Sequence, residues 1–261
     1  MSPHDWNAPS YERVATGVVA LGHEVLDRLT LTGDETVLDA GCGGGGVTEQ
    51  LVARLPHGHV IAVDSSPTMV ELCAAQVGNE RAEFRVADLT ALELGAPVDA
   101  ILSTATFHWI RDHDALFARL HGLLRPGGRL VAQCGGDGNV AEVRAAAAAV
   151  GEQEPFAADL VGFDPWHFAS AENTERRLRE AGFRDIRCWL EPRDVVTHEP
   201  AEYLRTVMLG AHLERLAPEH HDAFVEAVHA RLGAFEVAHY VRLNMDAVAE
   251  FPSAHSTVRL C

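Results

Sequence analysis

The sequence Val37-Leu38-Asp39-Ala40-Gly41-Cys42-Gly43-Gly44-Gly45-Gly46 carries the clearest structural signal in this 261-residue chain. An apolar run ends in a glycine-dense turn, and apolar residues at helical spacing resume over residues 47–55. The pattern predicts a strand, a tight loop and a helix. Glycines let the backbone approach a ligand closely, and the N–H groups at the start of the next helix are free to bind it. The segment therefore predicts a site for a nucleotide-like cofactor.

Two classes of cofactor fit this loop. Gly41, Gly43 and Gly46 match the Gly-x-Gly-x-x-Gly fingerprint of dinucleotide sites, where a helix N-terminus receives a pyrophosphate. Asp39 favours a different ligand, because a carboxylate at low dielectric repels a pyrophosphate but attracts an ammonium or a sulfonium. S-adenosylmethionine carries both of these cations together with a ribose. The residues favour this cofactor, and a turn-capping role for Asp39 stays open beside it.

Length and composition are those of an enzyme domain. With 47% hydrophobic and 23% charged residues, the chain can bury a full core. We expect a single domain over residues 1–261, with an N-terminal helical lid (1–30), a cofactor-binding core (31–136), substrate-side helices and last strands (137–249) and a tail (250–261). No apolar run approaches the roughly 20 residues of a membrane helix, and there is no leader-like segment, so we expect a cytoplasmic protein without a membrane partner. The five cysteines are odd in number and widely spaced, which predicts reduced thiols.

The formal net charge of −17 restricts the partners. A field of this sign repels a phosphate backbone, and no Lys or Arg run forms a basic patch, so nucleic acid is not an expected partner. A small-molecule acceptor is expected instead. If that acceptor is anionic it needs local cations, for which Arg13, Arg144 and Arg205 are the candidates. The 15 histidines contain no metal-binding array, which predicts no metal site. The oligomeric state is not specified by these patterns.

Strand and helix signals alternate after the glycine loop, as a parallel sheet requires. We predict strands at 59–64, 83–88, 98–103 and 129–134, with helices at 67–77 and 112–124. Asp39, Asp64 and Asp88 then end three successive strands, and ligands of open α/β sheets bind at the carboxyl ends of strands. Asp64 lies where such sites place an acid against the ribose hydroxyls. For Asp88, a helix-capping role fits equally well.

The later part of the chain predicts two more strands and a helical insertion. Residues 183–190 and 238–245 suit an antiparallel pair of strands, and residues 144–150 suit a helix. Residues 200–232 have apolar side chains at helical spacing, which predicts helices that either roof a pocket or simply pack against the core.

The order of these motifs resembles that of class I S-adenosylmethionine-dependent methyltransferases over residues 30–136. The segments that carry the resemblance are VLDAGCGGGG (37–46), AVDSSPTMVE (62–71), RVADL (85–89), DAILSTATFHWI (99–110) and LLRPGGRLV (123–131). A looser resemblance, to the trans-aconitate and juvenile hormone acid methyltransferases, comes from residues 5–11, from residues 107–113 and from the late helical stretch. The family implies an α/β, Rossmann-like fold with a seven-stranded, mostly parallel sheet, helices on both faces and a helical cap insertion.

The resemblance also implies roles for individual residues. Asp39 and residues 41–43 are expected along the methionine part of the cofactor, and Asp64 at the ribose hydroxyls. Met69 is expected near the adenine and Asp88 at the adenine amino group. The whole implied cofactor site is Asp39, Gly41, Cys42, Gly43, Asp64, Ser65, Met69, Asp88, Leu89, Ser103 and Thr104, with the last two near the methionine end.

The end of the fourth predicted strand should face the reacting centre. Methyl transfer is an in-line displacement, so alignment in a dry site can supply most of the catalysis. A carboxylate acceptor needs no base, whereas a hydroxyl or an ammonium must first lose a proton. His108 is the candidate base, although a histidine among Phe107, Trp109 and Ile110 is more often a packed core or pocket-wall residue. Phe107 and Trp109 are predicted as an aromatic wall of the acceptor site. Tyr11 is a further candidate substrate residue, which either closes over the cofactor or is ordinary packing.

The sequence therefore predicts an S-adenosylmethionine-dependent methyltransferase of a small molecule, acting at a carboxylate or hydroxyl oxygen. N- or C-methylation of a small metabolite is the alternative within the class. An NAD(P)-dependent oxidoreductase, or a noncatalytic cofactor-binding protein, is the alternative outside it.

Overall fold

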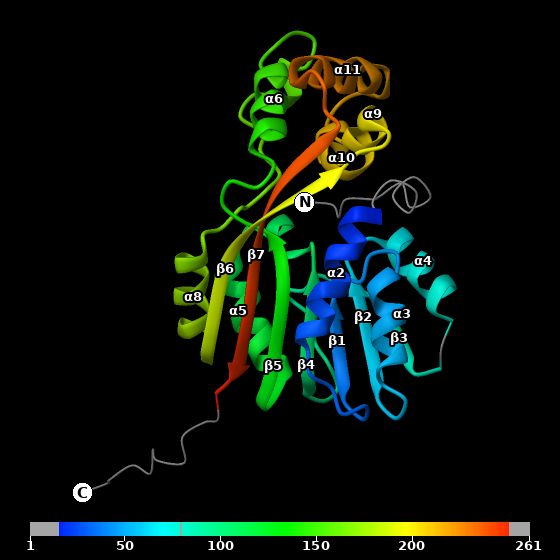
Figure 1. The fold of residues 1–261 in the computed structure, drawn as a ribbon, viewed down its shortest axis with the longest axis vertical. Coiled ribbons are helices and arrows are strands. Elements are labelled where there is room, and N and C mark those ends of the chain that lie inside the picture. The colour runs from blue at the N-terminus through cyan, green and yellow to red at the C-terminus, as the bar shows by residue number, and fades with distance from the viewer. Residues whose placement is uncertain (1–15, 79, 251–261) are drawn as a thin grey trace, which may run out of the picture.

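The computed structural model describes residues 16–78 and 80–250 (Figure 1). The expectations for Tyr11, Arg13 and residues 251–261 lie outside these residues. Seven strands form one open sheet in the order β3-β2-β1-β4-β5-β7-β6. The strands are β1 (Thr36–Ala40), β2 (His59–Asp64), β3 (Ala82–Val86), β4 (Val98–Thr104), β5 (Leu124–Gly135), β6 (Phe183–Val196) and β7 (Val237–Ala249).

The strand directions confirm the predicted mostly parallel sheet. β1 pairs in parallel with both β2 and β4, and the parallel pairing continues to β3 on one side and β5 on the other. β7 is antiparallel to both of its neighbours, β5 and β6. The chain moves outward from β1 to β3 and then returns to β4, so the order reverses between β1 and β4. In open α/β sheets a ligand binds at the carboxyl ends of the strands at such a reversal.

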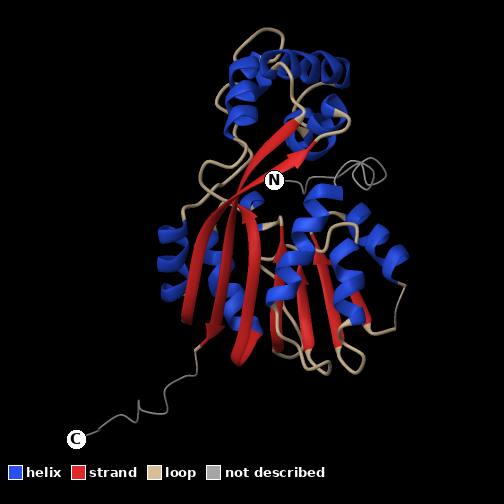
Figure 2. Ribbon diagram, viewed as in Figure 1, coloured by secondary structure: helices blue, strands red, loops and turns tan. Residues whose placement is uncertain are grey.

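Helices cover both faces of the sheet, as expected (Figure 2). One face packs against α2 (Thr16–Arg28), α3 (Gly46–Ala53) and α4 (Pro67–Val77), in a core that includes Leu26, Leu51 and Cys73. The other face packs against α5 (His113–Leu123) and α8 (Ala171–Glu180) through Phe117 and Leu178. None of the described helices is long and apolar enough to cross a membrane.

The helix starts follow from the residues that precede them. Ser66 accepts a hydrogen bond from the backbone N–H of Met69 at 3.3 Å, and Pro67 occupies the first helical position of α4. Asp112 caps α5 in the same way, accepting from the N–H of Ala115 at 2.9 Å. These local signals explain why the predicted boundaries of the two helices agree with the structure.

A second layer of helices stands beyond the carboxyl ends of the parallel strands (Figure 1). We call it the cap; it consists of α6 (Ala141–Gly151), α7 (Ala157–Leu160), α9 (Pro200–Tyr203), the π-helix η2 (Leu204–Met208), α10 (Gly210–Leu213), the 3-10 helix η3 (Pro218–His220) and α11 (His221–Leu232). The cap has its own core around Phe156, Leu204 and Phe224. β6 and β7 extend past the other strands into this layer (Figure 2). The predicted helical insertion at 200–232 is thus confirmed, and it both packs and roofs the sheet.

Candidate functional site

The glycine loop after β1 has the conformation that its sequence predicts. Gly41, Gly43 and Gly45 have φ values of 91°, 51° and 98°, a region that side-chain-bearing residues rarely adopt. The N–H groups of Gly41 and Cys42 both donate to the carbonyl of Val63 on β2, at 2.8 and 3.0 Å. A Cβ atom on Gly43 would meet no atom within 4 Å, so the loop presents open backbone there. The loop therefore has room for a ligand against its backbone.

Asp39 lies beneath this loop and is almost completely buried. Its Oδ2 accepts a hydrogen bond of 2.7 Å from the Thr48 hydroxyl. Burial raises the pKa of the Asp39 carboxyl to about 6, although the Thr48 hydrogen bond lowers it and the nearby Asp64 raises it further. A carboxylate held in such a place is stabilised by a cation, which is what the ammonium or sulfonium of S-adenosylmethionine supplies.

Asp64 ends β2 beside the same loop. Its two oxygens accept from the backbone N–H groups of Gly43 at 3.1 Å and Ser66 at 2.9 Å. Burial nevertheless raises the pKa of the carboxyl, with hydrogen bonds from Ser66, Gly43 and Ser65 acting in the opposite direction. The carboxylate keeps lone pairs that ribose hydroxyls can use. Asp39 and Asp64 therefore fit the predicted cofactor, and their assigned contacts with it stay predictions.

The other predicted cofactor residues differ in how the structure places them. Asp88 lies two residues beyond the end of β3 rather than on it, and its exposed carboxylate caps a turn by accepting from the N–H and the hydroxyl of Thr90, both at 2.8 Å. Leu89 is buried in the sheet core. Met69 is buried on α4 and Ser65 is exposed beside Asp64. The observed turn is the capping alternative for Asp88, and it leaves the adenine contact a prediction.

The end of β4 links the glycine loop to a second site. Ser103 is buried and donates to the carbonyl of Ala40 at 2.6 Å, and the Thr106 hydroxyl donates to the carbonyl of Thr104 at 2.9 Å. A Cβ on Gly41 would lie 1.9 Å from the Thr106 hydroxyl oxygen, so the two segments touch. Ala105, between the two threonines, has a positive φ of 56° and lines a cavity. The cofactor loop and this cavity are therefore neighbours.

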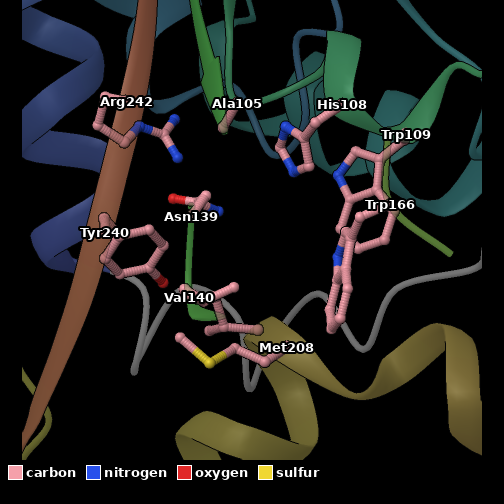
Figure 3. A pocket seen from close by; sticks show the side chains of 10 residues that line it. Ala105, His108, Trp109, Asn139, Val140, Trp166, Met208, Tyr240 and Arg242 are labelled. Carbon is pink, nitrogen blue, oxygen red and sulfur yellow. The ribbon is translucent and has the colours of Figure 1, made fainter. Parts of the chain in front are cut away.

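This acceptor cavity lies between the carboxyl edge of the sheet and the cap, with an empty volume of about 490 Å³ (Figure 3). It is lined by Ala105, His108, Trp109, Asn139, Val140, Trp166, Val207, Met208, Tyr240 and Arg242. Val140 and Ala105 are both non-glycine residues with positive φ. Backbone strain of this kind persists only where the surrounding structure enforces it, and it concentrates at ligand sites.

The sequence reasoning missed several residues of this cavity, among them Asn139, Trp166 and, on β7, Arg242. The Arg242 side chain is 2% exposed, and its guanidinium points into the cavity beside Tyr240 and Asn139, across from His108 (Figure 3). The guanidinium carbon lies 5.6 Å from the centre of the Tyr240 ring. The sequence feature that could have indicated Arg242 is an arginine inside a predicted strand, with an apolar residue on either side.

Two of the predicted cations are placed elsewhere. Arg144 pairs with Asp164, and Arg205 pairs with Asp222, and neither lines the acceptor cavity. Phe107 is likewise fully buried against Phe117 in the sheet core rather than in the cavity wall. Trp109 does line the cavity, 6.3 Å from Trp166 between ring centres, so the predicted aromatic wall consists of these two tryptophans.

His108 lines the cavity, and its hydrogen bond fixes its tautomer. Its Nδ1 accepts from the backbone N–H of Gly135 at 3.2 Å. Burial, with smaller contributions from Arg242 and His113, holds the pKa of the imidazole well below its usual range. A neutral imidazole whose Nδ1 accepts carries its proton on Nε2 and donates from there. The ring is therefore set up as a hydrogen-bond donor to the cavity, and the predicted role as a base stays untested.

Comparison with known proteins agrees with this geometry. A methyltransferase-domain model matches residues 37–128. The chain is 33% identical to a trans-aconitate 2-methyltransferase of Methylobacterium radiotolerans over 85% of this chain and 87% of that protein. It is 31% identical to a trans-aconitate 2-methyltransferase of Azoarcus sp. over 88% of this chain and 90% of the relative.

Solved structures show the same fold. Phosphoethanolamine N-methyltransferase 2 of Haemonchus contortus, solved with phosphomonomethylethanolamine and S-adenosylhomocysteine, has a TM-score of 0.60 at 19% identity over 89% of this chain and 53% of that chain. Mycolic acid cyclopropane synthase, solved with S-adenosylhomocysteine, has a TM-score of 0.57 at 18% identity over 88% of this chain and 83% of that one.

The fold and the glycine loop with its two acids define a class I S-adenosylmethionine-dependent methyltransferase. The matches to the two trans-aconitate 2-methyltransferases extend over most of the chain and identify a family within this class. The chain belongs to the methyltransferase family that includes the trans-aconitate 2-methyltransferases.

Proposed function

We propose that this enzyme methylates a carboxylate oxygen of a small organic acid, and that Arg242 binds the acid. The observation that carries the proposal is the charge of the acceptor cavity. The whole chain has 38 acidic residues against 21 Lys and Arg, yet none of the ten described lining residues is acidic and one is an arginine. A buried guanidinium is suited to a carboxylate, because its fork of N–H groups matches the two oxygens.

The other polar groups of the cavity also suit an anion. His108 directs its Nε2–H toward the cavity, by the tautomer that its Nδ1 contact requires. Asn139 accepts from the N–H of Val241 through Oδ1 at 3.0 Å, which leaves its amide N–H groups as donors. An ammonium acceptor would meet a buried cation instead. The arrangement therefore favours O-methylation of a carboxylate over N-methylation.

A carboxylate acceptor also needs no base in the cavity. The carboxylate is already ionised at neutral pH, so its oxygen can attack without losing a proton. The cofactor supplies an electrophilic methyl group, and this chain's residues orient the acceptor and exclude water. The contact between Thr106 and Gly41 brings the acceptor cavity next to the cofactor loop, which the transfer requires.

The trans-aconitate 2-methyltransferases in the family suggest trans-aconitate as the first acceptor to try. The purified enzyme is incubated with S-adenosylmethionine and trans-aconitate, and separately with an amine and an alcohol of similar size. We expect S-adenosylhomocysteine and a methyl ester with the acid alone. Mild alkaline hydrolysis separates the outcomes, because an ester releases methanol whereas an ether or an N-methyl group survives. Turnover of the amine alone, or a base-stable product, contradicts the proposal.

A cytoplasmic location is part of this proposal. The four cysteines among the described residues, Cys42, Cys73, Cys134 and Cys188, are free thiols, which suits a reducing compartment.

A further inference from the structure

A row of buried polar side chains lies on the face of the sheet that α2 covers. Side chains of β7 alternate between two environments: Leu243 and Met245 join the apolar core on the α5 side, whereas Arg242 and Asn244 face the α2 side. Asn244 is fully buried, and Gln133, its partner across β5, is 3% exposed. Amides are costly to bury unless they are hydrogen-bonded, so these side chains are expected to have hydrogen-bond partners.

The row is a continuous chain of hydrogen bonds. The Arg242 Nε–H donates to Gln133 Oε1 at 3.2 Å, and Gln133 Nε2 donates to Asn244 Oδ1 at 2.9 Å. Asn244 Oδ1 also accepts from the guanidinium of Arg28 on α2. Arg28 is held in turn by Asp246 at 3.1 Å and by the carbonyl of Ala132 at 2.8 Å. This series of hydrogen bonds therefore runs from Arg28 on α2 to Arg242 at the acceptor cavity.

The two cations dictate how both amides are oriented. A guanidinium only donates hydrogen bonds, so each arginine requires an amide oxygen to face it. Gln133 turns its oxygen to Arg242 and therefore its nitrogen to Asn244, which must present its own oxygen. Asn244 Nδ2 is then left to donate to Glu191 at 3.3 Å. Flipping either amide would face a donor with a donor, so the pattern has one low-energy arrangement.

We propose that Gln133 and Asn244 are positioning residues that hold the Arg242 guanidinium in the orientation that binds the acceptor's carboxylate, with Arg28 fixing the far end of the chain. This inference rests on the proposed function. Arg242 reaches the cavity on a long side chain, and a guanidinium binds both carboxylate oxygens only in one plane. Gln133 holds the Nε edge, and the terminal nitrogens of the guanidinium are the ones directed toward the cavity (Figure 3). Neither amide lines the cavity itself.

The test compares substitutions that break the chain with one that preserves it. Gln133→Leu and Asn244→Leu remove the acceptor that orients the next group, and each should raise the KM for trans-aconitate about tenfold while kcat changes less. Asn244→Asp keeps an oxygen for both Arg28 and Gln133, and combining it with Glu191→Gln supplies a donor at the place where the Asn244 amide met Glu191. The KM of this double variant should therefore stay within about threefold of wild type. Gln153→Leu, at an exposed glutamine two residues after the end of α6, is the matched control and should change neither constant.

A double-mutant cycle separates positioning from general damage. In an Arg242→Lys background there is no guanidinium for Gln133 to orient. Adding Gln133→Leu to this variant should therefore raise the KM for trans-aconitate no further. Calorimetry with S-adenosylhomocysteine should give wild-type affinity in every variant, which establishes that the sheet and the cofactor site are intact.

The two proposals fail in different ways. If Arg242→Lys itself leaves the KM for trans-aconitate unchanged, the proposed function of Arg242 is wrong. If Arg242→Lys raises KM but the effects of Gln133→Leu and Arg242→Lys multiply, the residues act independently and the positioning proposal is overturned while the proposed function stands. Equal KM values for Asn244→Leu and for the double variant Asn244→Asp with Glu191→Gln overturn the positioning proposal as well.

Discussion

The cofactor loop and the acceptor cavity are neighbours, yet they are built in opposite ways. The loop with Asp39 and Asp64 comes from one β-α-β segment and presents buried carboxylates, whose pKa values are raised by burial. The cavity draws its described lining from residues 105 to 242, and among these residues the Arg242 guanidinium carries the charge. One region thus suits a cationic ligand and the other an anionic one. A methyl transfer from a sulfonium to a carboxylate needs this division, because each reactant is recognised by the charge that it carries.

The largest effect should come from removing the cation of the cavity. We expect Arg242→Leu to lower kcat/KM for trans-aconitate by roughly 100-fold or more, because a carboxylate loses a buried ionic partner. Arg242→Leu also leaves the buried Gln133 Oε1 without its donor, which costs about 1–3 kcal/mol of stability, so thermal unfolding is measured first to establish that the variant is folded. The affinity for S-adenosylhomocysteine, measured by calorimetry, should stay unchanged. A parallel loss of cofactor affinity would show that the two regions are not separate.

Removing an acid of the cofactor loop should weaken cofactor binding and leave acceptor binding unchanged. Asp64→Ala removes the carboxylate predicted to hold the ribose hydroxyls, and we expect S-adenosylhomocysteine to bind about 10- to 100-fold more weakly, since hydrogen bonds to a charged group contribute about 1.5–3 kcal/mol. Calorimetry measures this, with Asp159→Ala, an exposed aspartate at the end of α7, as the control. Wild-type affinity in Asp64→Ala would remove the ribose assignment.

The same division explains what the sequence could predict. The glycine loop and its two acids depend on contacts between segments close in the chain, and each has a local signal: glycines at positive φ, an acid at a strand end, Ser66 before Pro67. The family resemblance added the cap as an expectation. Local patterns therefore predicted the cofactor loop and the individual strands, whereas the complete seven-stranded sheet was expected from the family resemblance.

The acceptor cavity had no such signal. Arg242 lies in a strand that the sequence predicted, but which face of β7 turns toward the cavity depends on its pairing with β5 and β6. Arg144 and Arg205 were the candidate cations from the sequence, because they lie in segments expected to line the acceptor site. In the structure each is paired with an aspartate outside the cavity lining. Phe107 and Trp109 are close in sequence, yet only Trp109 faces the cavity, because the 3-10 helix Phe107–Trp109 turns the former into the core. These outcomes are set by tertiary packing.

The two regions should also respond to pH with opposite signs, and Asp39 tests the cofactor side. Its pKa of about 6 lies above its ordinary value, so the folded apoprotein holds this proton more tightly than the unfolded chain does. Its contribution to stability is therefore lost as the pH rises from about 4 through 6. Asp39→Asn should raise the free energy of unfolding at pH 8 by on the order of 2 kcal/mol, less at pH 5, and weaken S-adenosylmethionine binding. Urea denaturation at the two pH values measures the free energy of unfolding. A stabilisation by Asp39→Asn that is larger at pH 5 than at pH 8 would contradict the prediction.

His212 tests the cap side, where the smallest effect is expected. Its ring is buried among Phe163, Phe224 and Trp166, and burial lowers its pKa to about 4. The unfolded chain takes up this proton near pH 6.5 and the folded chain only near pH 4, so stability is present above pH 6.5 and is lost as the pH falls toward 4. His212→Phe keeps the ring and removes the titration, and at pH 5 it should recover on the order of 1 kcal/mol relative to wild type. Urea denaturation at pH 7.5 and pH 5 measures this, with the exposed His198→Phe as the control. A gain in stability from His212→Phe that is larger at pH 7.5 than at pH 5 would contradict this assignment.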